Sequence, residues 1–162
     1  LALLSGLMKM QARTVATNEA ALALGDASDR ILAVATTHDQ LWRQDQSEAV
    51  DLAELLPQLC RQLDAQSPTV TVHSEIAPFE VVPNKVTSIA LLVTEVVTNA
   101  FKHAFDDQAG GEVRVQLSCV SGEAWLTVRN NGRGLPEGFD PNGAISASLG
   151  MRLIKTLGSS FG

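Results

Sequence analysis

A repeat of apolar positions between residues 24 and 41 constrains the fold more than any other feature of this chain. The repeat has alternating intervals of three and four residues, as in the core positions of a heptad: Leu24, Ala27, Ile31, Val34, His38 and Leu41. A stripe this narrow is buried only when partner helices cover it. A helical pattern over residues 1–16 precedes a possible cap at Thr17-Asn18. We therefore expect a helical hairpin that pairs with a second copy in a four-helix bundle, giving a homodimer through residues 1–43.

The remainder of the chain alternates predicted helices and strands. In chain order we expect a helix from Asp51 to about residue 66, a strand over 69–76, a short strand near 79–81, a long helix over 84–105, and a hairpin of strands over 113–119 and 124–129. Asp51 and Glu54 have the spacing of a capping box, and Pro57 should kink the first of these helices or delay its start. A last helix should begin at Gly150.

These elements predict an α+β fold in two parts. Residues 1–46 would form the dimerisation hairpin, and residues 47–162 an α/β sandwich with three helices on one face of a mostly antiparallel sheet. The apolar side of the long helix should carry five core residues: Val86, Ile89, Val93, Val96 and Ala100. The chain starts inside one apolar helical pattern and stops directly after another, so we expect it to be part of a longer protein.

Composition excludes several classes of function. The chain has 162 residues, 45% of them hydrophobic, and 12 basic against 18 acidic residues give a net charge of −6. This balance provides no broad surface for neutralising nucleic-acid phosphates. Cys60 and Cys119 are far apart in the sequence and form no metal motif, which favours a reducing cytoplasm. No apolar run is long enough to cross a bilayer, so we expect no membrane contact in this segment.

Four polar residues share one side of the long helix, opposite its apolar side. They are Glu95, Asn99, Lys102 and His103, at positions i, i+4, i+7 and i+8. The carboxylate and amide oxygens could hold a hydrated cation, while the two basic side chains contact phosphate. An ordinary solvated helix face is the alternative interpretation of the same pattern.

Glycines downstream favour the phosphate interpretation. Gly132 and Gly134 follow a predicted strand, and Gly150 begins a predicted helix. At such places backbone N–H groups can approach phosphate oxygens closely. Each of these glycine signals is weak when taken alone, because a Gly-x-Gly sequence is often only a turn.

The order of these motifs resembles the sensor histidine kinases. Residues 94–105 (TEVVTNAFKHAF) are similar to the N box of that family, residues 130–136 (NNGRGLP) to its first glycine box, and residues 148–153 (SLGMRL) to its second. Residues 10–42 resemble the dimerisation helices of the HWE-like branch, which has a short ATP lid. The resemblance therefore spans nearly the whole chain, and the N box is its most specific part.

The resemblance implies roles for individual residues. Asn99 would coordinate the Mg²⁺ that bridges the ATP phosphates, Glu95 would act at the reacting phosphate, and Lys102 and His103 would contact phosphate oxygens. The implied ATP-binding positions are Asn99, Asn130, Gly132, Gly134, Leu149 and Gly150. The segment from residue 135 to 148 would be the lid over the nucleotide.

Two departures from the family pattern stand out. The first glycine box of the family normally begins with Asp, which accepts a hydrogen bond from the adenine amino group, whereas this chain has Asn130. An amide oxygen can still accept that bond, but without charge assistance, at a cost of roughly 1 kcal/mol. The family's phosphoacceptor histidine would lie upstream of residue 1. The first histidine present is His38, which we expect to be structural, and His73 should lie on the surface.

The resemblance implies the core of a sensor histidine kinase that uses ATP and Mg²⁺. It would phosphorylate a histidine and pass the phosphoryl group to an aspartate of a response regulator. Two alternatives remain open from the sequence. One is a degenerate histidine phosphotransfer or scaffold protein that no longer binds ATP, as Asn130 would permit. The other is a serine kinase of the anti-sigma type, which the heptad hairpin disfavours.

Overall fold

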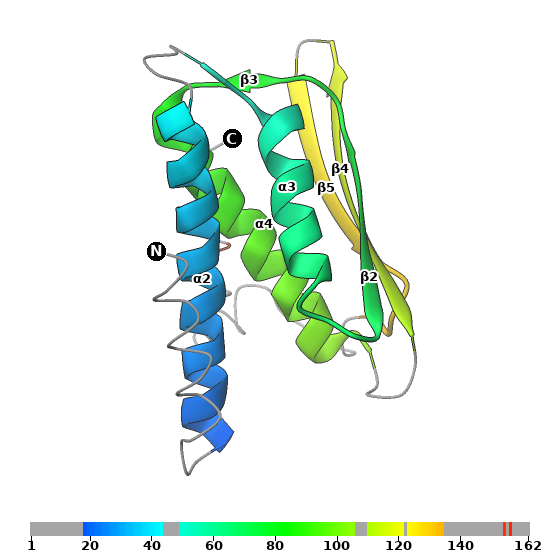
Figure 1. Cartoon of the computed structure of the whole chain (residues 1–162). Coiled ribbons are helices and arrows are strands. Elements are labelled where there is room, and N and C mark those ends of the chain that lie inside the picture. Colours follow the sequence, from blue (N-terminus) through cyan, green and yellow to red (C-terminus); the bar gives the residue numbers. More distant parts are fainter. Residues whose placement is uncertain are drawn as a thin grey trace.

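The computed structural model describes residues 18–43, 49–105, 110–121 and 123–134, together with Ile154 and Thr156. In chain order these ranges contain helix α2 (Asn18–Arg43), strand β1 (Val50–Asp51), helix α3 (Leu52–Asp64), strands β2 (Val70–Ile76) and β3 (Glu80–Val81), helix α4 (Pro83–His103), and strands β4 (Gly111–Val120) and β5 (Glu123–Asn130). Helices α3 and α4 lie between α2 and the sheet of β2, β4 and β5 (Figure 1). The α+β class is confirmed. None of the helices in these ranges is both long and apolar enough to cross a membrane.

The main sheet has the strand order β2-β4-β5. Strand β2 runs parallel to β4, with Val72 opposite Val113, and β4 runs antiparallel to β5, with Leu117 opposite Leu126. A parallel pair needs a long crossover connection, and α4 lies in the chain between β2 and β4. The predicted β4-β5 hairpin is confirmed, and its turn places Ser121 at a positive φ of 53°. The alternation of residues did not indicate the parallel pairing.

A second, two-stranded sheet fixes the start of α3. Strand β1 pairs antiparallel with β3, so that Asp51 lies opposite Glu80. Asp51 caps α3 as predicted, because its Oδ1 accepts the backbone N–H of Ala53 at 2.9 Å. The same oxygen accepts the N–H of Phe79 at 3.1 Å, which joins the helix start to the segment before β3. The helix then continues through Pro57, so the predicted delay of its start is wrong.

The hydrophobic core lies between the helices and the inner face of the main sheet. Five leucines of α3 are buried: Leu52, Leu55, Leu56, Leu59 and Leu63. They meet the alternate residues Val113, Val115 and Leu117 of β4 in one cluster. On α4, four of the five predicted core residues are buried, but Val96 is only half-buried and Val97 is fully buried in its place. The apolar face of α4 is therefore rotated by one residue near its middle.

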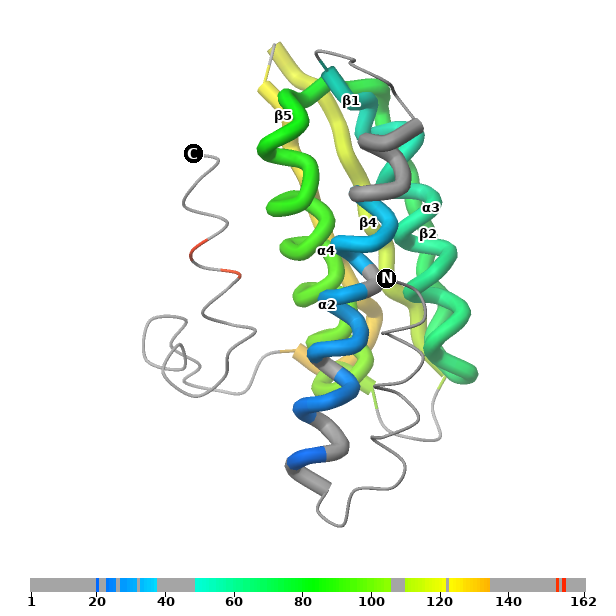
Figure 2. Tube along the Cα trace, turned by 60° about the vertical axis from the view of Figure 1, so that its left-hand side comes forward, coloured from blue at the N-terminus to red at the C-terminus, as the bar shows by residue number. Residues whose placement is uncertain are grey.

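Helix α2 packs on α4 and α3 through a different side from its heptad stripe. The buried residues of its described part are small or polar: Ser28, Ala33, Ala35, Thr36 and Thr37. Ala33 belongs to the same core cluster as α3 and α4. The heptad residues Leu24, Ala27 and Ile31 are half-buried, and Val34 is 37% exposed. Figure 2 shows α2 running along α4, and the predicted first helix over 1–16 lies outside the described residues.

Candidate functional site

The polar stripe on α4 changes from buried to exposed along the helix. Glu95 is buried, Asn99 is half-buried, and Lys102 and His103 are exposed in the last turn. Basic side chains in the last turn also interact favourably with the negative end of the helix dipole. The stripe therefore has one end enclosed by protein and one end open to solvent.

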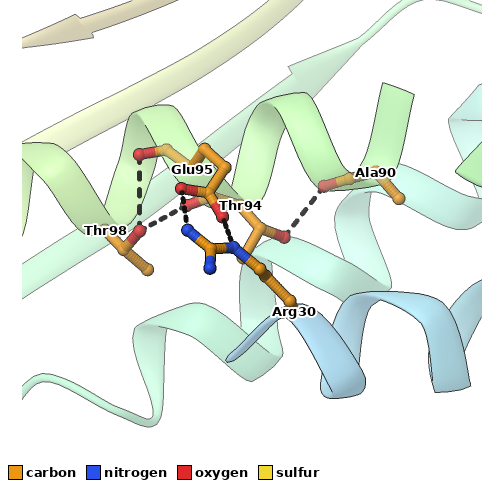
Figure 3. A network of polar contacts seen from close by, with 5 residues as sticks. All are labelled: Arg30, Ala90, Thr94, Glu95 and Thr98. Carbon is orange, nitrogen blue, oxygen red and sulfur yellow. Dashed lines mark hydrogen bonds and ion pairs between the residues drawn. The ribbon is translucent and has the colours of Figure 1, made fainter. Parts of the chain in front are cut away.

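Glu95 at the enclosed end forms a bidentate ion pair with Arg30 of α2. The Arg30 Nε donates to Glu95 Oε1, and its Nη2 donates to Oε2 at 3.1 Å (Figure 3). Relative exposure is 7% for the Glu95 side chain and 21% for that of Arg30. Parallel hydrogen bonds of this kind fix orientation as well as charge. Both carboxylate oxygens thus have a partner from another helix, a contact that the sequence did not indicate.

The two threonines that flank Glu95 satisfy their hydroxyl groups within α4. Thr94 donates to the carbonyl of Ala90 at 2.8 Å, and Thr98 donates to that of Thr94 at 2.8 Å (Figure 3). Thr98 also lies 3.3 Å from the carbonyl oxygen of Glu95. A buried threonine hydroxyl commonly bonds the carbonyl one turn back in this way. These groups therefore do not compete with Arg30 for the carboxylate.

The first glycine loop lies directly against the carboxyl end of α4. Arg133 donates its backbone N–H to the carbonyl of Ala104 at 2.8 Å and its Nε to the carbonyl of His103 at 2.7 Å. Gly132 approaches so closely that a Cβ at this position would overlap the carbonyl of Ala104. Gly134, in contrast, has open space around it. The fold thus brings together two motifs that are about 30 residues apart in sequence.

The two asparagines before Gly132 shape the same loop. Asn130 Oδ1 accepts the N–H of Gly132 at 3.1 Å, which forms an Asx turn at the end of β5. Asn131 Oδ1 accepts the N–H of Glu112 at 2.8 Å, and the N–H of Asn131 donates to the carbonyl of Glu112 at 3.2 Å. The loop is therefore fixed to β4 on one side and to α4 on the other. The exposed Asn130 retains a second acceptor lone pair.

The residues gathered at this end of α4 suit a nucleotide with a bound cation. Lys102, His103 and Arg133 are exposed basic residues around one helix end, and the Asn99 amide oxygen is a hard ligand of the type Mg²⁺ accepts. The missing Cβ of Gly132 permits the close loop approach already described. Glu95 cannot contact a phosphate or a metal ion through its carboxylate in the observed state, because Arg30 donates hydrogen bonds to both carboxylate oxygens.

Other predicted residues lie elsewhere. Leu149 and Gly150 of the second glycine box fall outside the described residues, as does the segment 135–148. His38 falls within α2, and His73 is exposed on β2 as predicted. Sequence reasoning missed Arg30 and the anchoring role of Arg133. The only indication of a role for Arg133 in the sequence was its position inside the first glycine box. Arg30 lies outside the heptad positions, so the heptad pattern gave no indication of its contact with Glu95.

Two family models match this chain. Residues 1–67 match the model described as histidine kinase. Residues 84–158 match the model described as histidine kinase-, DNA gyrase B-, and HSP90-like ATPase. The second match contains the α4 stripe and the glycine loop that the structure brings together.

The relatives of known function differ in how much of this chain they match. Blue-light-activated histidine kinase 2 of Erythrobacter litoralis is 40% identical over 103 residues, which is 62% of this chain and 26% of that protein. Sensor histidine kinase PdtaS of Mycobacterium tuberculosis is 30% identical over 161 residues, which is 96% of this chain and 31% of that protein. The chain thus spans about a third or less of these relatives. An anti-sigma F factor of Geobacillus stearothermophilus is 34% identical over 68 residues, covering 42% of this chain and 47% of its own length.

A solved structure of a histidine kinase domain is similar to nearly the whole chain. The histidine kinase domain of a blue-light activated histidine kinase from Erythrobacter litoralis matches with a TM-score of 0.72 and 27% identity. The match covers 94% of this chain and 71% of that one. It therefore includes both the helical N-terminal region and the α/β region.

Proposed function

The chain belongs to the sensor histidine kinases, and from this premise we propose that it forms the dimerisation and ATP-binding core of such an enzyme. In the whole protein this core would transfer the γ-phosphoryl group of ATP to a histidine, and from there to an aspartate of a response regulator. The observation that carries the proposal is the docking of the glycine loop onto the end of α4 through Arg133 and Gly132. This contact brings together the two motifs that would form the proposed nucleotide site.

Each residue of the site has a proposed task. Asn99 would hold Mg²⁺ through its amide oxygen, and Lys102 and His103 would neutralise phosphate charge at the open end of the stripe. Asn130 would accept the adenine amino group beside the Asx turn, while Gly132 and Gly134 would line the loop. Leu149 and Gly150 would contribute from the second glycine box. Bound ATP supplies the phosphoryl group, and the protein positions it and neutralises charge.

We further propose the surroundings of this core. It would act in the cytoplasm as a homodimer formed through residues 1–43, with the half-buried heptad residues Leu24, Ala27 and Ile31 facing helices other than α4. Its other protein partner would be a response regulator. Glu95 would act at the reacting phosphate once its carboxylate becomes accessible.

The test is the chemical nature of the phosphorylated residue in the whole protein. Incubation with γ-labelled ATP and Mg²⁺ should give a label that is stable in alkali and lost in acid, as a phosphohistidine is. An Asn99→Ala variant should lose most of this label, because it removes the proposed metal ligand. Asn84→Ala is the matched control, since Asn84 is exposed in the first turn of the same helix. It should label like the unmodified protein.

Other outcomes of this experiment would contradict the proposal. An acid-stable label on serine would instead favour a serine kinase of the anti-sigma type, the alternative that the sequence left open. Absence of any label, together with absence of Mg²⁺-ATP binding in a separate titration, would favour a scaffold protein that no longer binds ATP.

A further inference from the structure

The ion pair between Arg30 and Glu95 joins two parts of the chain with different proposed tasks. Arg30 lies on α2, in the proposed dimerisation hairpin, and Glu95 lies on α4, in the proposed ATP site. Both Glu95 oxygens accept hydrogen bonds from the Arg30 guanidinium. A carboxylate held in this way has its net charge compensated and its strongest acceptor positions used. It is therefore poorly placed to act on a phosphate, a metal ion or an attacking group.

The position of α2 along α4 reinforces this restriction. Glu95 is buried, whereas Lys102 and His103, two turns further along the same helix side, are exposed. Figure 3 shows Arg30 reaching from α2 to the side of α4 that carries Glu95. The docked helix thus covers the first part of the polar stripe and leaves its last turn open. A ligand at the open end would reach Glu95 only if α2 moved.

The described part of the interface that holds α2 in place includes small and polar contacts. Among the α2 side chains that the structure describes, the buried ones are small or short: Ser28, Ala33, Ala35, Thr36 and Thr37. Thr36 donates to Gln62 Oε1 of α3 at 2.6 Å, and the hydroxyl groups of Thr37 and Thr87 lie 3.4 Å apart. Water can replace such polar contacts at modest cost, and relative motion is expected across polar interfaces between domains.

We propose that docking of α2 on α4 is a latch, in which Arg30 sequesters Glu95 and holds the kinase site in an inactive state. Undocking of α2 frees the carboxylate, so that a signal which moves the hairpin controls the acid of the ATP site. The inference rests on the proposed kinase function, because it assigns regulation to that same site. It makes Arg30 a restraining residue, and loss of Arg30 must activate the site.

Removal of Arg30 gives the first test. In the whole protein, Arg30→Ala leaves a buried carboxylate without its partner, which favours undocking of α2 so that water can reach Glu95. We expect the initial rate of phosphorylation by Mg²⁺-ATP to rise at least about five-fold, the lower range of typical allosteric coupling. Arg114→Ala is the matched control, since Arg114 is exposed on β4. It should leave the rate unchanged.

A disulfide lock gives the second test and keeps Arg30 in place. The Thr37 and Thr87 side chains are close enough for the pair Thr37→Cys and Thr87→Cys to be bridged, in a Cys119→Ser background that removes the exposed native thiol. Oxidation should lower the phosphorylation rate at least about five-fold, and reduction should restore it. The Thr37→Cys single variant, treated identically, shows whether oxidation itself matters.

The outcomes separate the latch from the kinase proposal. If the reduced protein binds and uses Mg²⁺-ATP but the oxidised lock is equally active, the latch is wrong and the kinase function stands. A rate below that of the unmodified protein for Arg30→Ala, with normal folding by circular dichroism, would also overturn the latch, because Arg30 would then position Glu95 for the reaction. If no form of the protein binds nucleotide, both proposals fail.

Discussion

Two glycines of the same loop, Gly132 and Gly134, differ in what surrounds them. A Cβ on Gly132 would overlap the carbonyl of Ala104, whereas a Cβ on Gly134 would meet open space. We expect Gly132→Ala to lower the free energy of unfolding by about 1–3 kcal/mol, because the loop or the end of α4 must shift. Gly134→Ala should leave it unchanged or slightly higher. Urea denaturation of both variants measures the difference.

Equal effects of these two substitutions would contradict the close approach of the loop to α4. The comparison is matched in chemistry, since each variant adds one methyl group to the same loop. It therefore isolates the packing of Gly132 from the general effect of replacing glycine.

Cys60 is a residue whose protonation should affect stability at alkaline pH. Burial raises the pKa of its thiol from 9.0 to about 12, despite the opposing effect of Arg61. The unfolded thiol loses its proton first as the pH rises, so this contribution to stability is complete below pH 9 and is lost between pH 9 and 12. The free energy of unfolding should fall by up to about 1.4 kcal/mol per pH unit in this range. Cys60→Ala should show a shallower decline in denaturation experiments between pH 8 and 11.

Single residues could be predicted from the sequence where their role is local. Asp51 could be predicted as a cap from its capping-box spacing to Glu54, and the structure shows a local bond to the N–H of Ala53. His73 could be predicted as exposed because its neighbours on that side of the strand are polar. Arg30 could not be identified, because its partner is 65 residues away and nothing in the local pattern of α2 indicates it. The conformation of Asn130 could not be predicted either, because its Asx turn to the N–H of Gly132 depends on the folded conformation of the loop.

At the scale of elements, the packing can be tested by asking which of two neighbouring valines of α4 faces the core. Val97 is fully buried, whereas its neighbour Val96 is half-buried. We expect Val97→Ala to lower the free energy of unfolding by about 2 kcal/mol, from lost burial and the cavity left behind. Val96→Ala removes the same atoms and should cost less than about 1 kcal/mol. If Val96→Ala lowers the free energy of unfolding more than Val97→Ala does in denaturation experiments, Val96 is the core residue, as the sequence predicted.

The elements themselves followed largely from hydrophobic period and turn residues. Helix α3, helix α4, strand β2 and the β4-β5 hairpin all lie close to their predicted positions. Strand β1 was missed because Val50–Asp51 is too short to show alternation. The parallel pairing of β2 with β4 depends on the crossover through α4, which no single segment reveals. The phase error at Val96 arose because both valines suit an apolar face.

At the scale of the whole molecule, the docking of α2 joins the two predicted parts of the chain. The hydroxyl group of buried Thr36 on α2 donates a hydrogen bond of 2.6 Å to Oε1 of half-buried Gln62 on α3. A double-mutant cycle with Thr36→Val and Gln62→Leu should give a coupling energy of about 1 kcal/mol. The same cycle with Thr36→Val and Arg129→Leu should give no coupling, because exposed Arg129 lies on β5. Additive effects in the first cycle would argue against docking.

This docking is the part of the architecture that the sequence least suggested. The heptad repeat correctly predicted a helix, but it predicted that the helix packs through the stripe of Leu24, Ala27 and Ile31. Among the α2 side chains that the structure describes, those buried in this contact are small or polar, so they give a weak hydrophobic pattern in the sequence. The packing of such a face depends on shape and on specific hydrogen bonds, so only the assembled structure shows it.

The most direct test of the central claim is calorimetric titration of this chain with Mg²⁺-ATP. We predict binding in the micromolar to sub-millimolar range. Asn130→Asp should tighten it several-fold, because a carboxylate keeps the Asx turn and adds charge to the bond with the adenine amino group. A folded chain that binds no nucleotide in either form would contradict the account, since the loop and α4 would then meet without making an ATP site.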